Sequence, residues 1–119
     1  MVKRKVRPVL AEILEAIEGI ETHTAGKSLA EFEGDWLLRL GTQRALEIVS
    51  EACRHLPDEL LDLAPDVPWK KIRGIGNILR HEYHKIADEL IWVVVTENIL
   101  PLKAAIETIR QSVGDESQP

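Results

Sequence analysis

The feature that most constrains the fold is the recurrence of apolar residues at every third or fourth position along most of the chain. Near the N-terminus, the residues that follow this spacing are Leu10, Ile13, Leu14, Ile17 and Ile20. Side chains at such positions lie on one face of a helix, because an α-helix makes one turn every 3.6 residues. The periodicity therefore predicts an all-α protein built from amphipathic helices.

Proline and capping residues predict where the first helices begin and end. Pro8 is suited to a first helical turn, and the apolar spacing that follows it predicts a helix ending near residues 23–26. Ser28, with Glu31 three residues later, is typical of a capping box and predicts a short helix or turn over 28–34. Asp35 is expected to cap a long third helix that continues to about residue 55.

The second half of the chain is expected to contain two more helices after a turn over 58–63. The fourth helix is predicted from Trp69 to about Tyr83, and the last from Ala87 or Asp88 onward. The run 90–95 is rich in β-branched residues, but helical spacing continues far beyond the length of a strand. Pro101 is expected to kink the last helix, because its ring crowds a carbonyl one turn earlier and it has no N–H to donate.

Length and composition predict one domain over 1–113 with a polar, frayed tail over 114–119. The single cysteine, Cys53, cannot form a disulfide within the chain, which favours a reducing compartment and predicts a cytoplasmic protein. We interpret Cys53 as a small buried apolar residue. The apolar runs are too short for a transmembrane helix, and the basic N-terminus lacks the apolar stretch of a signal peptide.

The charge distribution leaves room for an anionic partner although the net charge is −5. Residues 1–11 contain four Lys or Arg and no acid. Residues 70–85 contain five Lys or Arg and one acid, so the rest of the chain is strongly acidic. Two local basic patches on an acidic body can still bind phosphate, although solvated helix faces would give the same pattern.

The fourth helix has the pattern most suggestive of chemistry. Ile72, Ile75 and Leu79 form its expected buried stripe. Five polar residues share an arc of about 100° away from that stripe on an ideal helix, namely Arg73, Asn77, Arg80, His81 and His84.

Such an arc suits a phosphodiester. Arginine stabilises charge on phosphoryl oxygens, and histidine transfers protons near neutral pH. Asn77, one turn before His81, is placed to orient it. His81-Glu82 begins like the zinc motif H-E-x-x-H, but Lys85 occupies the place of the second histidine, which argues against a zinc site.

Several ordered motifs resemble HepT-like toxins of the HEPN superfamily over nearly the whole chain. They are Arg7-Pro8, Arg44-Ala-Leu-Glu-Ile48, Pro68-Trp-Lys-Lys-Ile72, His81-Glu-Tyr83, and Asp88 with Trp92 and Leu100-Pro-Leu102. The resemblance implies an up-and-down bundle of four to five main helices that forms a homodimer. It further implies a metal-independent endoribonuclease that needs no cofactor and cleaves RNA in a cleft between the two protomers.

The resemblance also implies a partner and a set of site residues. The partner is an MntA-like nucleotidyltransferase antitoxin, which silences such toxins by adding AMP to a tyrosine. His81 matches the motif histidine, Tyr83 the modified tyrosine, and Asn77 the asparagine that follows the motif arginine. The arginine itself is absent, because Gly76 occupies its position.

The missing arginine leaves two functional hypotheses open. Arg73, Arg80 or Arg44 could replace it in an active ribonuclease, with His84 at the edge of the cleft. Alternatively, the chain is a catalytically weakened HEPN module that binds RNA, a nucleotide or the nucleotidyltransferase. A helical dimer whose polar arc has no function is the third possibility.

Overall fold

The computed structural model describes residues 5–114, which are helical almost throughout and include no strand. The elements are α1 (Val6–Thr24), α2 (Leu29–Glu33), α3 (Trp36–Cys53), α4 (Asp58–Leu61), α5 (Trp69–His81), α6 (His84–Val93), a π-helical segment η1 (Val94–Asn98) and α7 (Ile99–Val113). The predicted all-α class is confirmed. Most of the predicted tail, 115–119, lies outside the described residues, as do Lys3 and Arg4 of the N-terminal basic patch.

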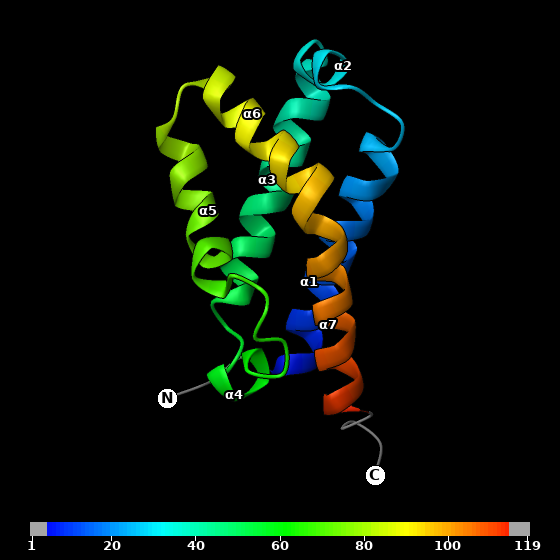
Figure 1. Cartoon of the computed structure of the whole chain (residues 1–119), viewed down its shortest axis with the longest axis vertical. Coiled ribbons are helices and arrows are strands. Elements are labelled where there is room, and N and C mark those ends of the chain that lie inside the picture. Colours follow the sequence, from blue (N-terminus) through cyan, green and yellow to red (C-terminus); the bar gives the residue numbers. More distant parts are fainter. Residues whose placement is uncertain (1–4, 115–119) are drawn as a thin grey trace.

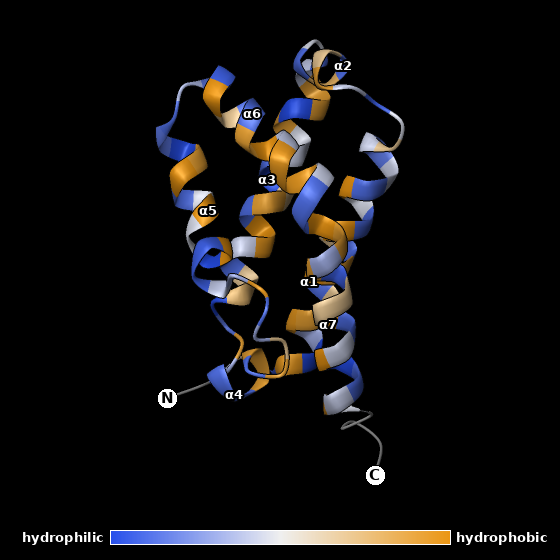
Figure 2. Cartoon of the chain, in the orientation of Figure 1, coloured by the Kyte–Doolittle hydropathy of each residue, from blue (hydrophilic) through white to orange (hydrophobic). Residues whose placement is uncertain are grey.

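The long helices form an antiparallel, up-and-down bundle (Figure 1). The chain ascends in α1, descends in α3, ascends in α5 and descends through α6 and α7. Helix α3 packs against α1 on one side and against α5 on the other, and α7 packs against α1. Apolar residues of each helix face the interior (Figure 2), where the fully buried side chains include Ile13, Ile17, Phe32, Leu46, Leu79, Ile91 and Ile106. Helix α3 is therefore the central support for α5.

The predicted caps of the short second helix and of the third helix are confirmed. The Ser28 backbone N–H donates to Glu31 Oε1 at 2.8 Å, and the Glu31 N–H donates to Ser28 Oγ at 3.1 Å, which completes a capping box. The hydrogen bond from the Ser28 backbone holds the pKa of Glu31 below its usual value. Asp35 Oδ1 accepts a hydrogen bond from Leu38 N at 3.0 Å and caps α3.

The predicted boundaries of the fourth and last helices are wrong by a few residues. Helix α5 ends at His81 rather than Tyr83, and α6 begins at His84 rather than near Ala87. Glu82 and Tyr83 between them have extended backbone, with ψ values of 156° and 148°. Two successive extended residues interrupt the helical hydrogen-bond ladder, so the chain changes direction and α6 can bury its own apolar face.

Two contacts fix α6 on the bundle. Arg39 Nε on α3 donates to Asp88 Oδ2 at 2.8 Å, and the two side chains are only 18% and 6% exposed. The Phe32 ring on α2 packs on the Trp92 ring at a centroid distance of 5.1 Å. These contacts join α6 to α2 and α3, and so set the direction in which the chain leaves the corner at Tyr83.

The region of the predicted kink contains a widened turn. Residues Val94–Asn98 form a π-helical segment, and the Ile99 N–H donates to the Val94 carbonyl five residues earlier. Pro101 has no N–H to donate to the Glu97 carbonyl, and its ring crowds that carbonyl. The widened turn lies where α6 and α7 meet at an angle (Figure 1). Within 5–114, no helix is long and apolar enough to cross a membrane.

Candidate functional site

The start of α5 is fixed by its first residue. Trp69 is half-buried, and its indole Nε1–H points back toward the loop after α4. The Trp69 Nε1–H donates to both the Leu61 carbonyl oxygen, at 3.1 Å from Nε1, and the Ala64 carbonyl oxygen, at 3.0 Å. A buried indole usually requires such a partner, and here two carbonyls satisfy it. The contact ties the 62–68 loop to α5 and defines the position from which the helix ascends.

The middle of α5 packs directly on α3 around Gly76. Ser50 Oγ donates to the Arg73 carbonyl at 2.8 Å and accepts from the Gly76 N–H at 3.4 Å. A Cβ at position 76 would lie 3.5 Å from Ser50 Cβ and 3.6 Å from Glu47 Cα. Position 76 is therefore buried against α3, and a long side chain there would have to pass between the two helices.

Arg73 belongs to this helix junction rather than to the outer face of α5. Its Nη2 donates to the Leu56 carbonyl at 3.3 Å and to Asp58 Oδ1 at 3.4 Å. Its Nε is buried and has no hydrogen-bond partner among residues 5–114. The sequence placed Arg73 in one arc with His81 from its helical angle alone. In the structure its guanidinium turns toward the connection between α3 and α4.

The exposed face at the end of α5 contains Asn77, Arg80 and His81. These three residues occupy its last turns, so the structure keeps this part of the predicted arc together. His84 is exposed but lies on α6, so its predicted place in the α5 arc is wrong: that angle assumed an unbroken helix.

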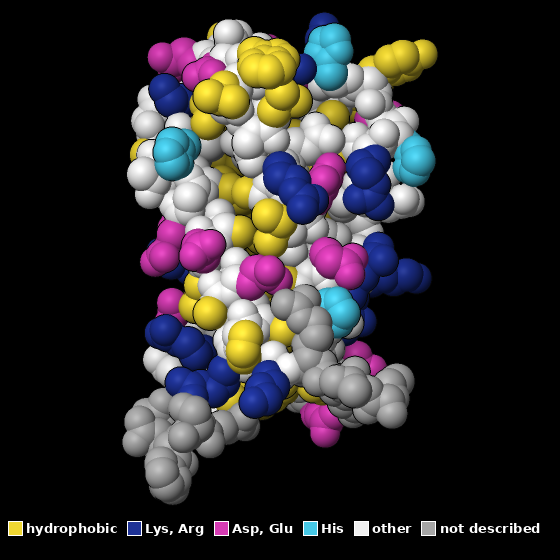
Figure 3. All heavy atoms as spheres, turned by 180° about the vertical axis from the view of Figure 1, so that it is seen from behind, with side chains coloured by type: hydrophobic (Ala, Val, Ile, Leu, Met, Phe, Trp, Pro, Cys, Tyr) yellow, Lys and Arg dark blue, Asp and Glu magenta, His cyan; other side chains and the backbone are white. Residues whose placement is uncertain are grey.

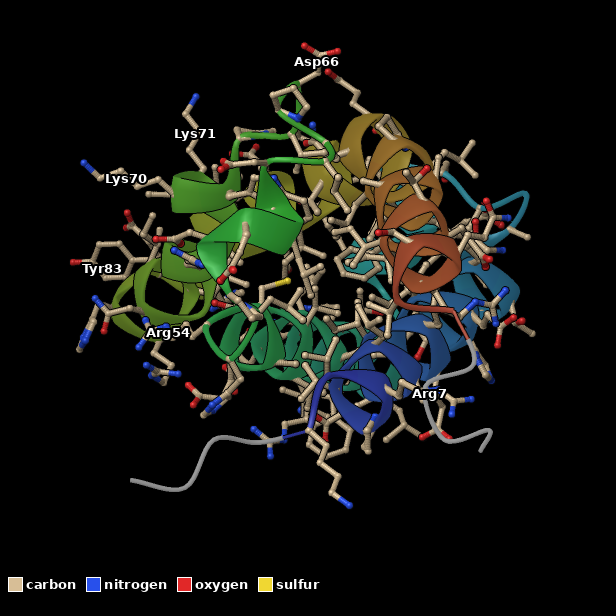
Figure 4. The ribbon with its side chains drawn as sticks, turned by 90° about the horizontal axis from the view of Figure 1, so that it is seen from below. Arg7, Arg54, Asp66, Lys70, Lys71 and Tyr83 are labelled. Carbon is tan, nitrogen blue, oxygen red and sulfur yellow. The ribbon has the colours of Figure 1, made fainter. Side chains whose placement is uncertain are left out.

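Tyr83 projects into solvent at the corner between α5 and α6. Its side chain is 81% exposed, and Figure 4 shows it on the outer side of the molecule. A regular helix through residue 83 would have placed the ring beside the buried stripe. The helix break after His81 is what makes the phenol accessible.

Arg44 lies in a different part of the molecule. It lines a groove of about 700 Å³ between α1 and α3, whose lining includes Glu15, Gly19, Leu37, Gly41, Ala45 and Ile48 but no residue of α5. Its side chain is 72% exposed, and its Nη1 lies 3.5 Å from Glu47 Oε1. Seen from behind, the molecule has apolar side chains gathered at its upper end and down the middle of that face (Figure 3).

The first turns of α3 expose apolar side chains. Leu37 and Leu40 follow the helical spacing of apolar residues in this helix, but they are 71% and 44% exposed. Together with Trp36, which is 67% exposed, they form an apolar patch on the first turns of α3. Helical spacing identifies the apolar stripe of a helix. It does not show whether a neighbouring helix is long enough to cover the whole stripe. We call Trp36, Leu37 and Leu40 the α3 apolar patch.

The described residues contain no group of three or more His, Cys, Asp or Glu side chains placed to hold a metal ion. Cys53 is fully buried, as predicted, and burial raises the pKa of its thiol to about 12. The exposed end of α5 presents an imidazole, a guanidinium and a carboxamide, from His81, Arg80 and Asn77.

The bundle and these groups define an all-helical protein with an exposed, phosphate-compatible helix face. The family model for "Ribonuclease HepT-like" matches residues 13–109. A "Probable ribonuclease HepT" of Thermococcus cleftensis is 33% identical over 92% of this chain and 99% of the relative. A "Putative RNase" of Methanocaldococcus jannaschii is 35% identical over 92% of this chain and all of the relative. No solved structure matches the chain.

The chain belongs to the HepT-like ribonuclease family of the HEPN superfamily, and the predicted resemblance is confirmed. Membership makes it a nuclease, with RNA as the class of substrate. Its motif nevertheless contains Gly76 where the resemblance leads us to expect arginine. How the chain supplies the missing cation is the central question for its mechanism.

Proposed function

We propose that the chain is the toxin of a toxin–antitoxin pair and cleaves RNA without a metal ion. The supporting observation is the exposed Asn77, Arg80 and His81 set on the last turns of α5. His81 takes the proton from a ribose 2′-hydroxyl as that oxygen attacks the adjacent phosphorus. The P–O5′ bond breaks, and the leaving oxygen takes up a proton from water. The products are a 2′,3′-cyclic phosphate and a 5′-hydroxyl.

Arg80 is the best candidate to stabilise the charge on the phosphoryl oxygens. Arg73 is committed to Leu56 and Asp58. Arg80 is exposed and lies one helical turn after Gly76, so the two positions share a face of α5. Helical side chains lean toward the N-terminus and cover the preceding turn. Position 76 is buried against α3, so Arg80 offers the cation from the exposed side of the same turn rather than from the position of the motif arginine.

A second copy of the chain is the proposed occupant of the α1–α3 groove. Leu37 of the α3 apolar patch lines the groove, which also has charges of both signs, since Glu15 lies on the α1 wall and Arg44 on the α3 wall. No residue of α5 lines this groove, so a dimer formed there leaves Asn77, Arg80 and His81 outside the interface rather than in the cleft that the resemblance implies. We expect Leu37→Asp to reduce the mass measured by light scattering from dimer to monomer. An unchanged dimer would place the interface elsewhere.

Tyr83 is the proposed acceptor of AMP from an MntA-like nucleotidyltransferase. The transfer would join the Tyr83 phenol oxygen to the α-phosphorus of ATP and release pyrophosphate. The accessible corner supports this proposal, because an extended, exposed segment fits into a second active site more readily than a helix does. Mass spectrometry after incubation with ATP and the nucleotidyltransferase should show added AMP on the wild type and none on Tyr83→Phe.

The main test measures cleavage of RNA by the purified protein in EDTA. We expect His81→Ala to slow cleavage by at least about 100-fold, as loss of a general acid or base does. Arg80→Ala should slow it by a similar factor. His55→Ala is the matched control, because His55 is an exposed histidine that pairs with Glu51 at the end of α3.

The weakened-module alternative predicts a different result. RNA would bind without being cleaved, and His81→Ala would leave binding unchanged. Expression of the active wild type in a bacterium should arrest growth, and His81→Ala should relieve that arrest. Unimpaired growth at high soluble expression would contradict the toxin proposal.

A further inference from the structure

The outer face of α5 continues well beyond the proposed catalytic residues. Lys70, Gly74, Asn77 and His81 are separated by four, three and four residues, which places them on one side of the helix. Lys70, Asn77 and His81 are all exposed. We call these four residues the outer stripe of α5. It extends for about 16 Å from Lys70 to His81 at the rise of an α-helix.

The outer stripe has no side chain at its middle position, Gly74, so the helix backbone is uncovered there. A Cβ built at position 74 would meet nothing within 4 Å, so no packing contact or turn requires glycine there. Glycine in a helix interior costs about 1 kcal/mol relative to alanine. It also allows another molecule to approach the helix backbone closely. At Gly76 the close neighbour is α3, whereas at Gly74 that space is open.

Charge favours an anion at the far end of the stripe. Lys70 is exposed at the start of α5, where the helix dipole is also positive. Figure 4 shows Lys70 and Tyr83 projecting from the same outer side of the molecule, while Lys71 points toward the side on which Asp66 lies. The two neighbouring lysines therefore face different surroundings.

We propose that the outer stripe binds the strand that flanks the scissile bond, with Lys70 on a phosphate a few nucleotides away. This inference rests on the proposed function and adds the course of the substrate. The strand would follow α5 and pass closely over Gly74. A stripe one side chain wide fits a single strand, whose backbone it follows through phosphate contacts without selecting bases.

The test measures binding of a short, fluorescently labelled 2′-O-methyl oligoribonucleotide by anisotropy at several salt concentrations. This probe has no free 2′-hydroxyl at its linkages, so binding is measured even if the protein cleaves nothing. Lys70→Gln should weaken binding severalfold and reduce the slope of log affinity against log salt by about 0.7, the loss of one single-strand phosphate contact. Lys71→Gln makes the same charge change one residue away and should have little effect.

Gly74→Gln separates a role in binding from a role in folding. Glutamine favours helix more than glycine does, so the melting temperature should rise while RNA affinity falls. Equal effects of Lys70→Gln and Lys71→Gln on RNA affinity, or unchanged RNA affinity in Gly74→Gln, would overturn the proposal that the outer stripe binds RNA. Absence of probe binding by the wild type at low salt would also overturn it. Binding along the stripe without cleavage of unmodified RNA would instead refute only the proposed ribonuclease mechanism.

Discussion

The ion pair between Arg39 and Asp88 offers a way to perturb α6 without changing α5. Its Nε–Oδ2 distance is 2.8 Å, and the Asp88 side chain is only 6% exposed. Arg39→Met keeps much of the side-chain length but leaves the carboxylate without its cation. Breaking a buried pair in this way costs about 3–5 kcal/mol. The 18% exposure of Arg39 admits some water, so we expect about 3 kcal/mol.

A loss of this size should be clear in thermal and chemical denaturation. For a domain of this length, 3 kcal/mol corresponds to a fall in melting temperature of roughly 10 °C. The midpoint of urea unfolding should fall while the m-value stays constant. Arg39→Met combined with Asp88→Leu removes both charges and should recover most of the loss, because the penalty comes from the unpaired carboxylate. A cost below about 1 kcal/mol for Arg39→Met would refute this reasoning, since an exposed pair behaves in that way.

Three further predictions concern α5, the buried thiol and the cap of α2. Gly76→Ala should fold normally, because its Cβ meets Ser50 at 3.5 Å, whereas Gly76→Arg should lower stability by about 1–3 kcal/mol in urea denaturation through overpacking. Burial raises the pKa of Cys53 to about 12, so the folded state holds its proton longer than the unfolded state. Stability should therefore fall as pH rises from about 9 toward 12, and Ellman's reagent should react with Cys53 only after unfolding. Ser28→Ala should cost about 1 kcal/mol in urea denaturation.

Sequence predicted the helices well where the determining interactions are local. The capping box at Ser28 and the cap at Asp35 need only residues three positions away, and both are present. The break after His81 has no such signal, because neither Glu82 nor Tyr83 is proline or glycine. It accompanies the packing of α6 on α2 and α3, which is a tertiary effect.

For the candidate site, too, the sequence predicted what depends on local helix geometry and missed what depends on contacts between helices. Helical angles place Asn77, Arg80 and His81 on the exposed side, and the structure agrees. They do not show that the long Arg73 side chain folds back to Leu56. The close contact between Gly76 and Ser50 joins residues far apart in the sequence, so only the folded chain reveals why position 76 faces a neighbouring helix.

The widened turn at Val94–Asn98 has a consequence for how chains of this kind can change in length. A π-helical turn accommodates one more residue than an α-helical turn in the same place. Deleting one residue there would allow the turn to close as ordinary α-helix while α7 kept its orientation against α1. A deletion inside a helix is usually costly, but this position can accept the loss of one residue. Evolutionary gaps between relatives should therefore be tolerated here more readily than elsewhere in the bundle.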